Sequence, residues 1–246
     1  MRTKRLGDML LELGLITEGQ LKEALDYQAK EKERLGTTLV KHHYITEGQL
    51  IDALRLQLGI DYIDTGAMYR ALGLKMLRQG IPMVEDARLL AMLEETDIDF
   101  AGGRVYLDGE DVSDLIRTQE ISKAASDCSA FAAVRKKLVE LQQKMARAKS
   151  VIMDGRDIGT VVLKDAPYKF FLTASEEERA LRRYRELAAK GASQTFEEVL
   201  EQIRQRDYND THRAVTPLRK ADDAIEIDST AMSMEEVVDF ICGQIQ

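Results

Sequence analysis

The sequence predicts an α/β fold: a parallel sheet with helices on both faces and a small β-meander insert, preceded by a small all-α domain built from two repeats. Three observations lead to this fold class. Apolar, strand-like segments alternate with amphipathic helical segments from about residue 60 onward. Residues 98–112 alternate in polarity around pairs of glycines, which is typical of a meander. The first 58 residues repeat one pattern at an offset of 29.

The repeat defines the first predicted domain, residues 1–58. Residues 5–28 read RLGDMLLELGLITEGQLKEALDYQ and residues 34–57 read RLGTTLVKHHYITEGQLIDALRLQ, with thirteen of 24 positions identical. Each copy predicts a short apolar helix, a turn, and a second helix opened by ITEGQL. The spacing of a capping box occurs once in each copy, at Thr17 with Gln20 and at Thr46 with Gln49. Two copies are too few for a solenoid, so we expect a compact helical domain with pseudo-symmetry.

The second predicted domain, residues 59–246, alternates strands and helices. Buried-type strands are expected at 60–64, 150–154, 168–174 and 223–228. Helices are expected by apolar periodicity at 66–79, 85–95, 131–148, 175–190 and 195–213, with another at the C-terminus. This alternation predicts a parallel sheet whose ligands lie at the carboxyl ends of the strands.

Composition excludes several classes of protein. The chain carries 35 Lys and Arg against 43 Asp and Glu, and a net charge of −8 argues against a nonspecific nucleic-acid binder. No apolar run is long enough to span a membrane and the N-terminus has no signal-peptide core, so we expect a cytoplasmic protein. The two cysteines, Cys128 and Cys242, lack metal-type spacing and are expected to be buried free thiols. No metal site is predicted from protein ligands alone.

Four segments place aspartate and arginine side by side, two of them directly after a predicted strand. They are DTGAMYR (64–70), SDCSAFAAVR (126–135), DGRDIGT (154–160) and RDYNDTHRAV (206–215). Arginine binds phosphate with two parallel N–H groups, and a fixed carboxylate accepts from sugar hydroxyls or a base amino group. Together they could hold a nucleoside monophosphate, whereas each pair alone is more often a surface ion pair of little energetic value.

These motifs together resemble the bacterial (d)CMP kinase family. DTGAMYRA, LDGEDVS followed by IRT, MDGRDIGTVV and RAVTPL match its patterns in order and spacing over about 185 residues. The resemblance implies a P-loop-kinase-like fold, in which the meander is the inserted CMP-binding subdomain. It also implies transfer of the γ-phosphoryl group of ATP to CMP or dCMP with Mg²⁺. It gives neither the preference between CMP and dCMP nor the oligomeric state.

The resemblance assigns roles by position. Arg70, Arg156 and Arg213 match the arginines that hold the CMP phosphate. Ser126, Arg135 and Asp157 match the residues that read cytosine, and Arg206 and Asp210 match the ribose contacts. The pair at the end of the family's second strand is matched by Asp64 and Thr65. Of these, Asp64 is expected to be a catalytic residue and Thr65 a substrate contact. Arg179, Arg182 and Arg183 match a mobile lid that neutralises transition-state charge, although an ordinary solvated helix with i,i+4 ion pairs explains this stretch equally well.

One required part is missing from the sequence. A P-loop kinase holds the ATP phosphates with G-x-x-x-x-G-K-[ST] between its first strand and first helix. No such motif occurs here: Lys followed by Ser or Thr is found only at Lys149–Ser150, without the glycines. In the resembled family this loop lies 20–30 residues before DTGAMYR, where the second repeat stands. We therefore expect impaired or absent catalysis, and a sheet with a gap or two unpaired edges where the first strand is lost.

The repeat domain has a resemblance of its own. It is similar to the N-terminal domain of type II secretion and type IV pilus assembly ATPases, a subset of which binds cyclic di-GMP. The matching positions of that site are Arg5, Gly7, Gly14, Gln28, Arg34, Gly36 and Gln57. The second copy departs from the pattern at His43, where the family has glycine. Alternatively, the leucines form a core and the RLG motifs only mark helix starts.

Three hypotheses stay open at this point. In the leading hypothesis, the chain is a cytidylate kinase-like protein with impaired catalysis. In the second, it is a non-catalytic binding protein, in which a cyclic di-GMP sensor domain is fused to a degenerate CMP-binding module. In the third, the chain results from the joining of the two domains at LGIDYIDTGAMYR (58–70), a stretch compatible with both families, and has no selected function.

Overall fold

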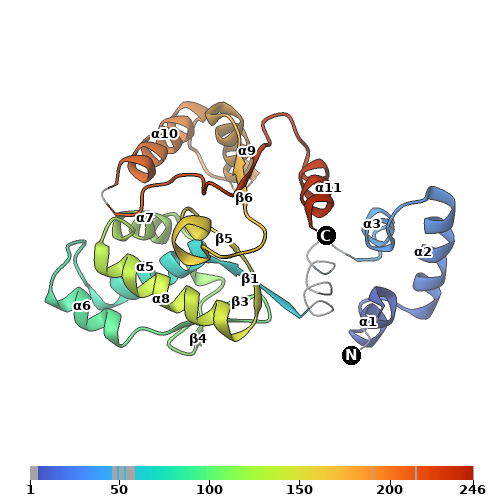
Figure 1. The fold of residues 1–246 in the computed structure, drawn as a ribbon, viewed down its shortest axis with the longest axis horizontal. Coiled ribbons are helices and arrows are strands. Elements are labelled where there is room, and N and C mark those ends of the chain that lie inside the picture. Colours follow the sequence, from blue (N-terminus) through green and yellow to red (C-terminus); the bar gives the residue numbers. More distant parts are fainter. Residues whose placement is uncertain are drawn as a thin grey trace. The chain divides into compact units, whose positions relative to one another are not determined.

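The computed structural model describes residues 5–45, 49, 53, 59–189, 191–213 and 215–245. Figure 1 labels its helices and strands, and the chain divides into two compact units. The first contains Met1–Cys128 and Glu140–Asp154, and the second contains Ser129–Val139 and Gly155–Gln246. The predicted boundary at residues 58 and 59 falls at the edge of the described residues and stays a prediction.

Residues 5–45 form the helices α1 (Leu6–Glu12), α2 (Glu18–Glu31) and α3 (Leu35–Lys41). They enclose a small core whose fully buried side chains include Leu10, Ala24 and Leu39. The predicted capping box at Thr17 is confirmed. Its hydroxyl accepts from Gln20 N–H at 3.2 Å, and the Gln20 side chain accepts from Thr17 N–H at 2.8 Å. The second predicted box, at Thr46, lies outside the described residues.

The two repeats share one backbone geometry at the turn that follows the first helix of each copy. Gly14 has φ 65° and His43, its equivalent 29 residues on, has φ 59°. In both copies the next residue donates its N–H to a leucine carbonyl, from Leu15 to Leu10 at 3.0 Å and from Tyr44 to Leu39 at 2.9 Å. Glycine at position 14 therefore meets the need for a left-handed residue, and His43 accepts the same conformation at some cost.

Gly7 has a packing role. A Cβ on Gly7 would lie 2.8 Å from a methyl group of Leu21, so the absence of a side chain lets α1 pack closely on α2. Nothing lies within 4 Å of a Cβ placed on Gly14. Helix packing and turn conformation thus explain both glycines without a ligand.

The first unit holds a parallel strand pair and the helices around it. Strands β1 (Ile60–Asp64) and β5 (Ser150–Asp154) pair in register, with Asp64 opposite Asp154. Helix α5 (Thr65–Gln79) follows β1 directly, capped by the Asp64 side chain and ended by Gly80 at φ 61°. Its buried face includes Met68, Leu72 and Met76. The other helical elements are α6 (Ala87–Glu94), η1 (Leu115–Arg117), α7 (Gln119–Cys128) and part of α8 (Ala132–Ala148).

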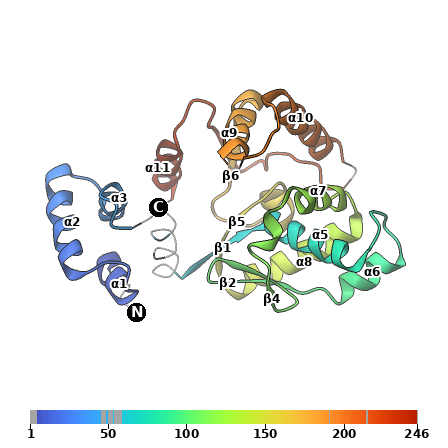
Figure 2. The same cartoon turned by 180° about the vertical axis from the view of Figure 1, so that it is seen from behind.

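The predicted meander is confirmed. Strands β2 (Ile98–Ala101), β3 (Arg104–Leu107) and β4 (Glu110–Asp111) form an antiparallel sheet (Figure 2). Asp108 and Gly109 join β3 to β4 with φ 51° and 84°, as the two central residues of a type I′ hairpin turn require. The Asp108 carboxylate pairs at 2.6 Å with Lys75, a buried lysine of α5. This ion pair anchors the meander to α5.

The second unit contains another parallel strand pair. Strands β6 (Phe170–Thr173) and β7 (Ile225–Asp228) pair in parallel. Helix α9 (Glu176–Ala189) packs on α10 (Phe196–His212) through an edge-to-face contact of Tyr184 with Phe196. The other described elements are the first part of α8, a single π-turn, η2 (Ile158–Val162), and α11 (Met234–Gln244).

The α/β class is confirmed, but the expected parallel sheet is observed as two separate two-stranded pairs in the described part of the chain. Strands of a parallel sheet are normally covered on both faces. Here Ile152 of β5 is 58% exposed and Leu172 of β6 is 57% exposed. Of the two cysteines, Cys128 is buried as expected and Cys242 is exposed, so the expectation of two buried thiols was wrong for Cys242.

We predict that Asp108→Asn lowers the free energy of unfolding by about 1–2 kcal/mol, because it leaves the buried Lys75 ammonium without its anion. Asparagine suits the same turn and can still accept from Asp97 N–H, as Asp108 does at 2.9 Å, so the substitution isolates the lost charge. Urea unfolding measures the change.

The matched control is Asp114→Asn. Asp114 pairs with Arg104 at 2.8 Å but its side chain is 83% exposed, so we expect a change below about 0.5 kcal/mol. Equal effects of the two substitutions would show that the Lys75 contact does not anchor the meander.

Candidate functional site

Two carboxylates meet at the carboxyl ends of β1 and β5. Asp64 Oδ1 accepts from Ala67 N–H at 2.9 Å, and Asp64 Oδ2 accepts from Arg70 Nη2 at 2.7 Å. The main-chain carbonyl of Asp154 accepts from Thr65 Oγ1 at 2.7 Å. The Asp154 side chain accepts from the Tyr62 hydroxyl at 3.0 Å. The predicted residues Asp64, Thr65 and Arg70 therefore lie together, with Asp154 as a neighbour that sequence reasoning missed.

The environment of Asp154 disfavours its negative charge. Burial is the main cause, and the nearby Asp64 carboxylate adds to it, so the pKa of Asp154 is raised above its ordinary value. Burial and the Asp154 charge likewise raise the pKa of the Tyr62 hydroxyl. A signal for Asp154 was present in the sequence, because it ends a predicted strand just as Asp64 does.

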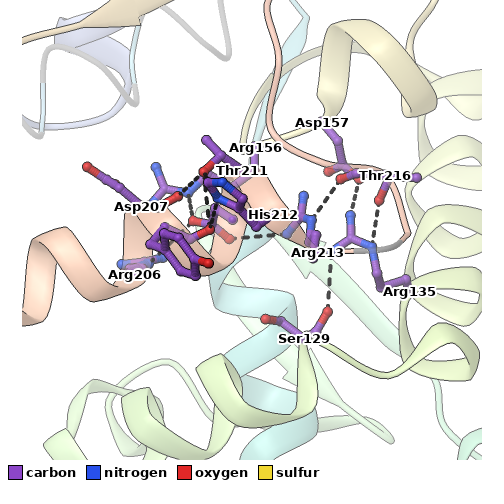
Figure 3. A network of polar contacts seen from close by, with 12 residues as sticks. Ser129, Arg135, Arg156, Asp157, Arg206, Asp207, Thr211, His212, Arg213 and Thr216 are labelled. Carbon is purple, nitrogen blue, oxygen red and sulfur yellow. Dashed lines mark hydrogen bonds and ion pairs between the residues drawn. The ribbon is translucent and has the colours of Figure 1, made fainter.

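In the second unit, Arg135 and Asp157 form a buried ion pair (Figure 3). Arg135 is 3% exposed and Asp157 is 7% exposed. The Arg135 guanidinium also donates through Nε to Thr216 Oγ1 at 2.7 Å and through Nη1 to the Ser129 carbonyl at 3.4 Å. Asp157 immediately precedes the π-turn η2, and its carbonyl accepts from Val161 N–H at 2.9 Å. The turn thus fixes the main chain from which the Asp157 carboxylate of the DGRD motif extends.

A second charged cluster surrounds Asp210 at the end of α10. Asp210 accepts from Arg213 Nη1 at 3.2 Å and pairs with Arg156 Nε at 2.8 Å. Arg206, one turn earlier on α10, has its Nε 3.9 Å from the same carboxylate. Asp210 is buried, whereas the Arg156 side chain is 40% exposed. Three predicted arginines are therefore gathered around one predicted carboxylate.

The three arginines of the expected lid lie on α9 and are all ion-paired. Arg179 Nη2 lies 2.6 Å from Asp207 of α10. Arg182 pairs with Glu178 at 2.9 Å and donates to the Ser229 carbonyl at 2.8 Å. Arg183 pairs with Glu186 at 3.1 Å. Two of these pairs have the i,i+3 or i,i+4 spacing of an ordinary solvated helix, which was the alternative interpretation.

The structure gathers most of the predicted nucleotide residues in three groups, one around Asp64 in the first unit and two, around Asp157 and Asp210, in the second. Ser126 lies on α7 in the first unit. Thr216, like Asp154, was missed: its role depends on backbone conformation, which the motif RAVTPL does not reveal.

The predicted cyclic di-GMP residues lie in the N-terminal helices. Arg5 and Arg34 are the N-cap residues of α1 and α3, Gly36 is buried in α3, and Gln28 lies on α2. Gln57 is outside the described residues.

Within the described part of the chain, no three His, Cys, Asp or Glu side chains are grouped as metal ligands. A search of the same residues for a helix that could cross a bilayer found none.

Comparison with known proteins places this chain in a family. The family model for cytidylate kinase matches residues 47–246. The chain belongs to the cytidylate kinase family. Among its curated relatives, the cytidylate kinase of Caldanaerobacter subterraneus subsp. tengcongensis is 53% identical over 189 residues, which are 77% of this chain and 84% of the relative. The cytidylate kinase of Clostridioides difficile is 48% identical over 189 residues, 77% of this chain and 88% of that relative.

We predict that in this cytidylate kinase family member Asp154→Asn raises the free energy of unfolding at neutral pH. Between the ordinary pKa and the raised pKa of Asp154, the folded state holds a proton that the unfolded chain has already released. Wild-type stability therefore falls as pH rises through the window above the ordinary pKa of 3.8. Asparagine carries no charge and still accepts from Tyr62. Urea unfolding should show the gain at neutral pH and lose it below 3.8.

Asp228→Asn is the control, and we expect it to change the free energy of unfolding in the opposite direction. Hydrogen bonds from Thr230 lower the pKa of Asp228, so its charge stabilises the fold above the ordinary pKa and this contribution is lost as pH falls. The control variant should be less stable than the wild type at neutral pH. If Asp154→Asn behaved in the same way, the raised pKa of Asp154 would be refuted.

Proposed function

We propose that this chain binds cytidine monophosphate through the arginine and carboxylate clusters and transfers a phosphoryl group to it slowly or not at all. The nominal reaction of the family is phosphorylation of CMP or dCMP by ATP. The observation that carries the proposal is the pair of preformed clusters in the second unit: Arg135 with Asp157, and Arg156 and Arg213 with Asp210. Their carboxylates hold the guanidinium groups in place before a ligand arrives.

The chemistry of each cluster fits one part of CMP. A guanidinium and a carboxylate side by side, as in Arg135 and Asp157, offer a donor for the carbonyl oxygen of cytosine and an acceptor for its amino group. Arg156 and Arg213 supply planar N–H donors of the kind that bind phosphate bidentately. Arg206 and Asp210 are assigned to the ribose, and Ser126 to the base. In the first unit, Arg70 and Thr65 are assigned to the substrate and Asp64 to the phosphoryl-transfer step.

Binding of ATP and transfer of its phosphoryl group have less support in this chain than CMP binding. A kinase of this class stabilises the transferred phosphoryl group mainly by positioning and charge neutralisation. The sequence has no G-x-x-x-x-G-K-[ST] segment to supply the amide cradle and the lysine. Loss of a single comparable donor reduces turnover by roughly 10²–10³-fold, so loss of the whole loop should reduce it further. The lid arginines Arg179, Arg182 and Arg183 would have to leave their present ion pairs to contribute.

Mg²⁺ accompanies ATP in cytidylate kinases. It is usually held by one or two carboxylates together with substrate phosphates. Asp64 and Asp154 fit this role, because a cation would relieve the mutual repulsion that helps to raise the pKa of Asp154. When bound, the ion would neutralise phosphate charge.

We predict that calorimetry detects CMP binding to the full chain and that Arg156→Ala weakens it at least about tenfold, through the lost phosphate contact. Binding of cytidine, which has no phosphate, should change less than about twofold. Arg156 is partly exposed, and Asp210 keeps Arg213 as a partner, so the variant should fold. Arg88→Ala is the control, because Arg88 pairs only locally with Asp86 at the start of α6. Equal loss of CMP and cytidine binding would contradict the assignment.

A coupled ADP-release assay tests the catalytic half of the proposal. With CMP, ATP and Mg²⁺ we predict turnover at least about 10³-fold below that of the Caldanaerobacter relative measured alongside. Turnover within about tenfold of that relative would contradict impaired catalysis while leaving CMP binding intact.

Cyclic di-GMP binding by the N-terminal repeats stays an alternative proposal. Its support is that Arg5 and Arg34 occupy equivalent N-cap positions in the two copies. The conformational role of Gly14 and the packing role of Gly7 reduce the weight of the glycine pattern as support.

A further inference from the structure

Thr216 connects the two charged clusters of the second unit. Its side-chain hydroxyl accepts a hydrogen bond from Arg135 Nε at 2.7 Å. Its main-chain carbonyl accepts another from Arg213 Nε, also at 2.7 Å. Figure 3 shows Thr216 beside the Arg135 side chain, with Asp157 on the same guanidinium. One residue thus contacts both the arginine assigned to cytosine and an arginine assigned to phosphate.

The backbone of Thr216 is in an unfavourable conformation. Its φ is 48°, and a β-branched residue rarely adopts a positive φ. The segment around it is closed by a hydrogen bond from Leu218 N–H to the Asp210 carbonyl at 2.7 Å. Such conformations persist where the surroundings impose them, and they are common at ligand clamps. Here the conformation directs the hydroxyl and the carbonyl of one residue to different arginines.

The hydroxyl of Thr216 is the third group that holds the Arg135 guanidinium in place. The Asp157 carboxylate holds Nη2, the Ser129 carbonyl accepts from Nη1, and the Thr216 hydroxyl accepts from Nε. These three partners come from separate parts of the chain, and together they define the plane of a guanidinium that is almost fully buried. Without the hydroxyl, Nε would be left without this partner and the guanidinium would be free to tilt.

We propose that Thr216 is a positioning residue that sets the preference of this site for cytosine over uracil monophosphates. Uracil has a carbonyl oxygen where cytosine has an amino group, and Asp157 is the acceptor that distinguishes them. Because Arg135 holds Asp157, a tilted Arg135 also misplaces that acceptor. The inference rests on the proposed function, since it requires that Arg135 and Arg213 bind CMP.

The test is calorimetry of CMP and UMP on the full chain with two substitutions. Thr216→Val keeps the branched shape and the main-chain carbonyl but removes the hydroxyl. It should weaken CMP binding about tenfold and UMP binding less than about twofold, so that the CMP-to-UMP preference falls about fivefold or more. Thr216→Ser retains the hydroxyl and should stay within about twofold of the wild type for both ligands.

Thr96→Val is the matched control. It removes another buried threonine hydroxyl, one that donates only to the Met92 carbonyl at 2.6 Å, and should lower stability without changing the CMP-to-UMP preference. An unchanged preference in Thr216→Val, in a chain that binds CMP, would overturn the inference about Thr216 and leave the proposed function standing.

A wild-type chain that binds no CMP would overturn the proposed function and the specificity part of this inference. The positioning part is then decided by NMR of the arginine Nε–H groups. Thr216→Val should speed hydrogen exchange at Arg135 Nε, whereas Arg213 Nε, bonded to the retained carbonyl, should not change. Equal exchange at Arg135 in the two proteins would overturn the positioning role.

Discussion

The buried ion pair between Arg135 and Asp157 is the interaction on which the proposed nucleotide site depends. Removing two charges from water is costly, and a buried pair contributes little net stability compared with well-packed apolar side chains. Such a pair is more easily explained by what it does for a ligand. The surrounding contacts support this view, because the π-turn after Asp157 and the Thr216 hydroxyl hold the two charged groups in fixed positions. Base recognition would require little rearrangement of this pair.

The same principle applies to the charges around Asp210. Arg156 and Arg213 would repel each other if left alone, and the shared carboxylate offsets that repulsion while keeping both near the end of α10. In the proposed function, this organised set of groups binds the monophosphate acceptor. The chain has no corresponding motif for a triphosphate donor, which is why we separate CMP binding from catalysis in the proposal. Ile152 of β5 and Leu172 of β6 expose apolar side chains, although strands of a parallel sheet are normally covered on both faces.

Local features of the fold were predictable from the sequence, and tertiary features were not. The helix expected at 66–79 is observed as Thr65–Gln79, since its cap, its apolar period and its terminal glycine are all local signals. The capping box at Thr17 and the meander at 98–112 were predictable for the same reason. Which strands pair depends on distant contacts, so the division into two strand pairs could not be derived from periodicity. Thr216 was missed because its role comes from a positive φ, whereas Asp154 could have been found by the rule that selected Asp64.

Hydrogen–deuterium exchange of the full chain, with and without saturating CMP, tests the central claim most directly because it needs neither catalysis nor a substituted protein. The claim is that the clusters around Asp157 and Asp210 are the acceptor site. CMP should then slow amide exchange in the segments 155–162 and 206–218 and leave the helices α1 to α3 unchanged. No protection in either segment at a CMP concentration that saturates binding would contradict it.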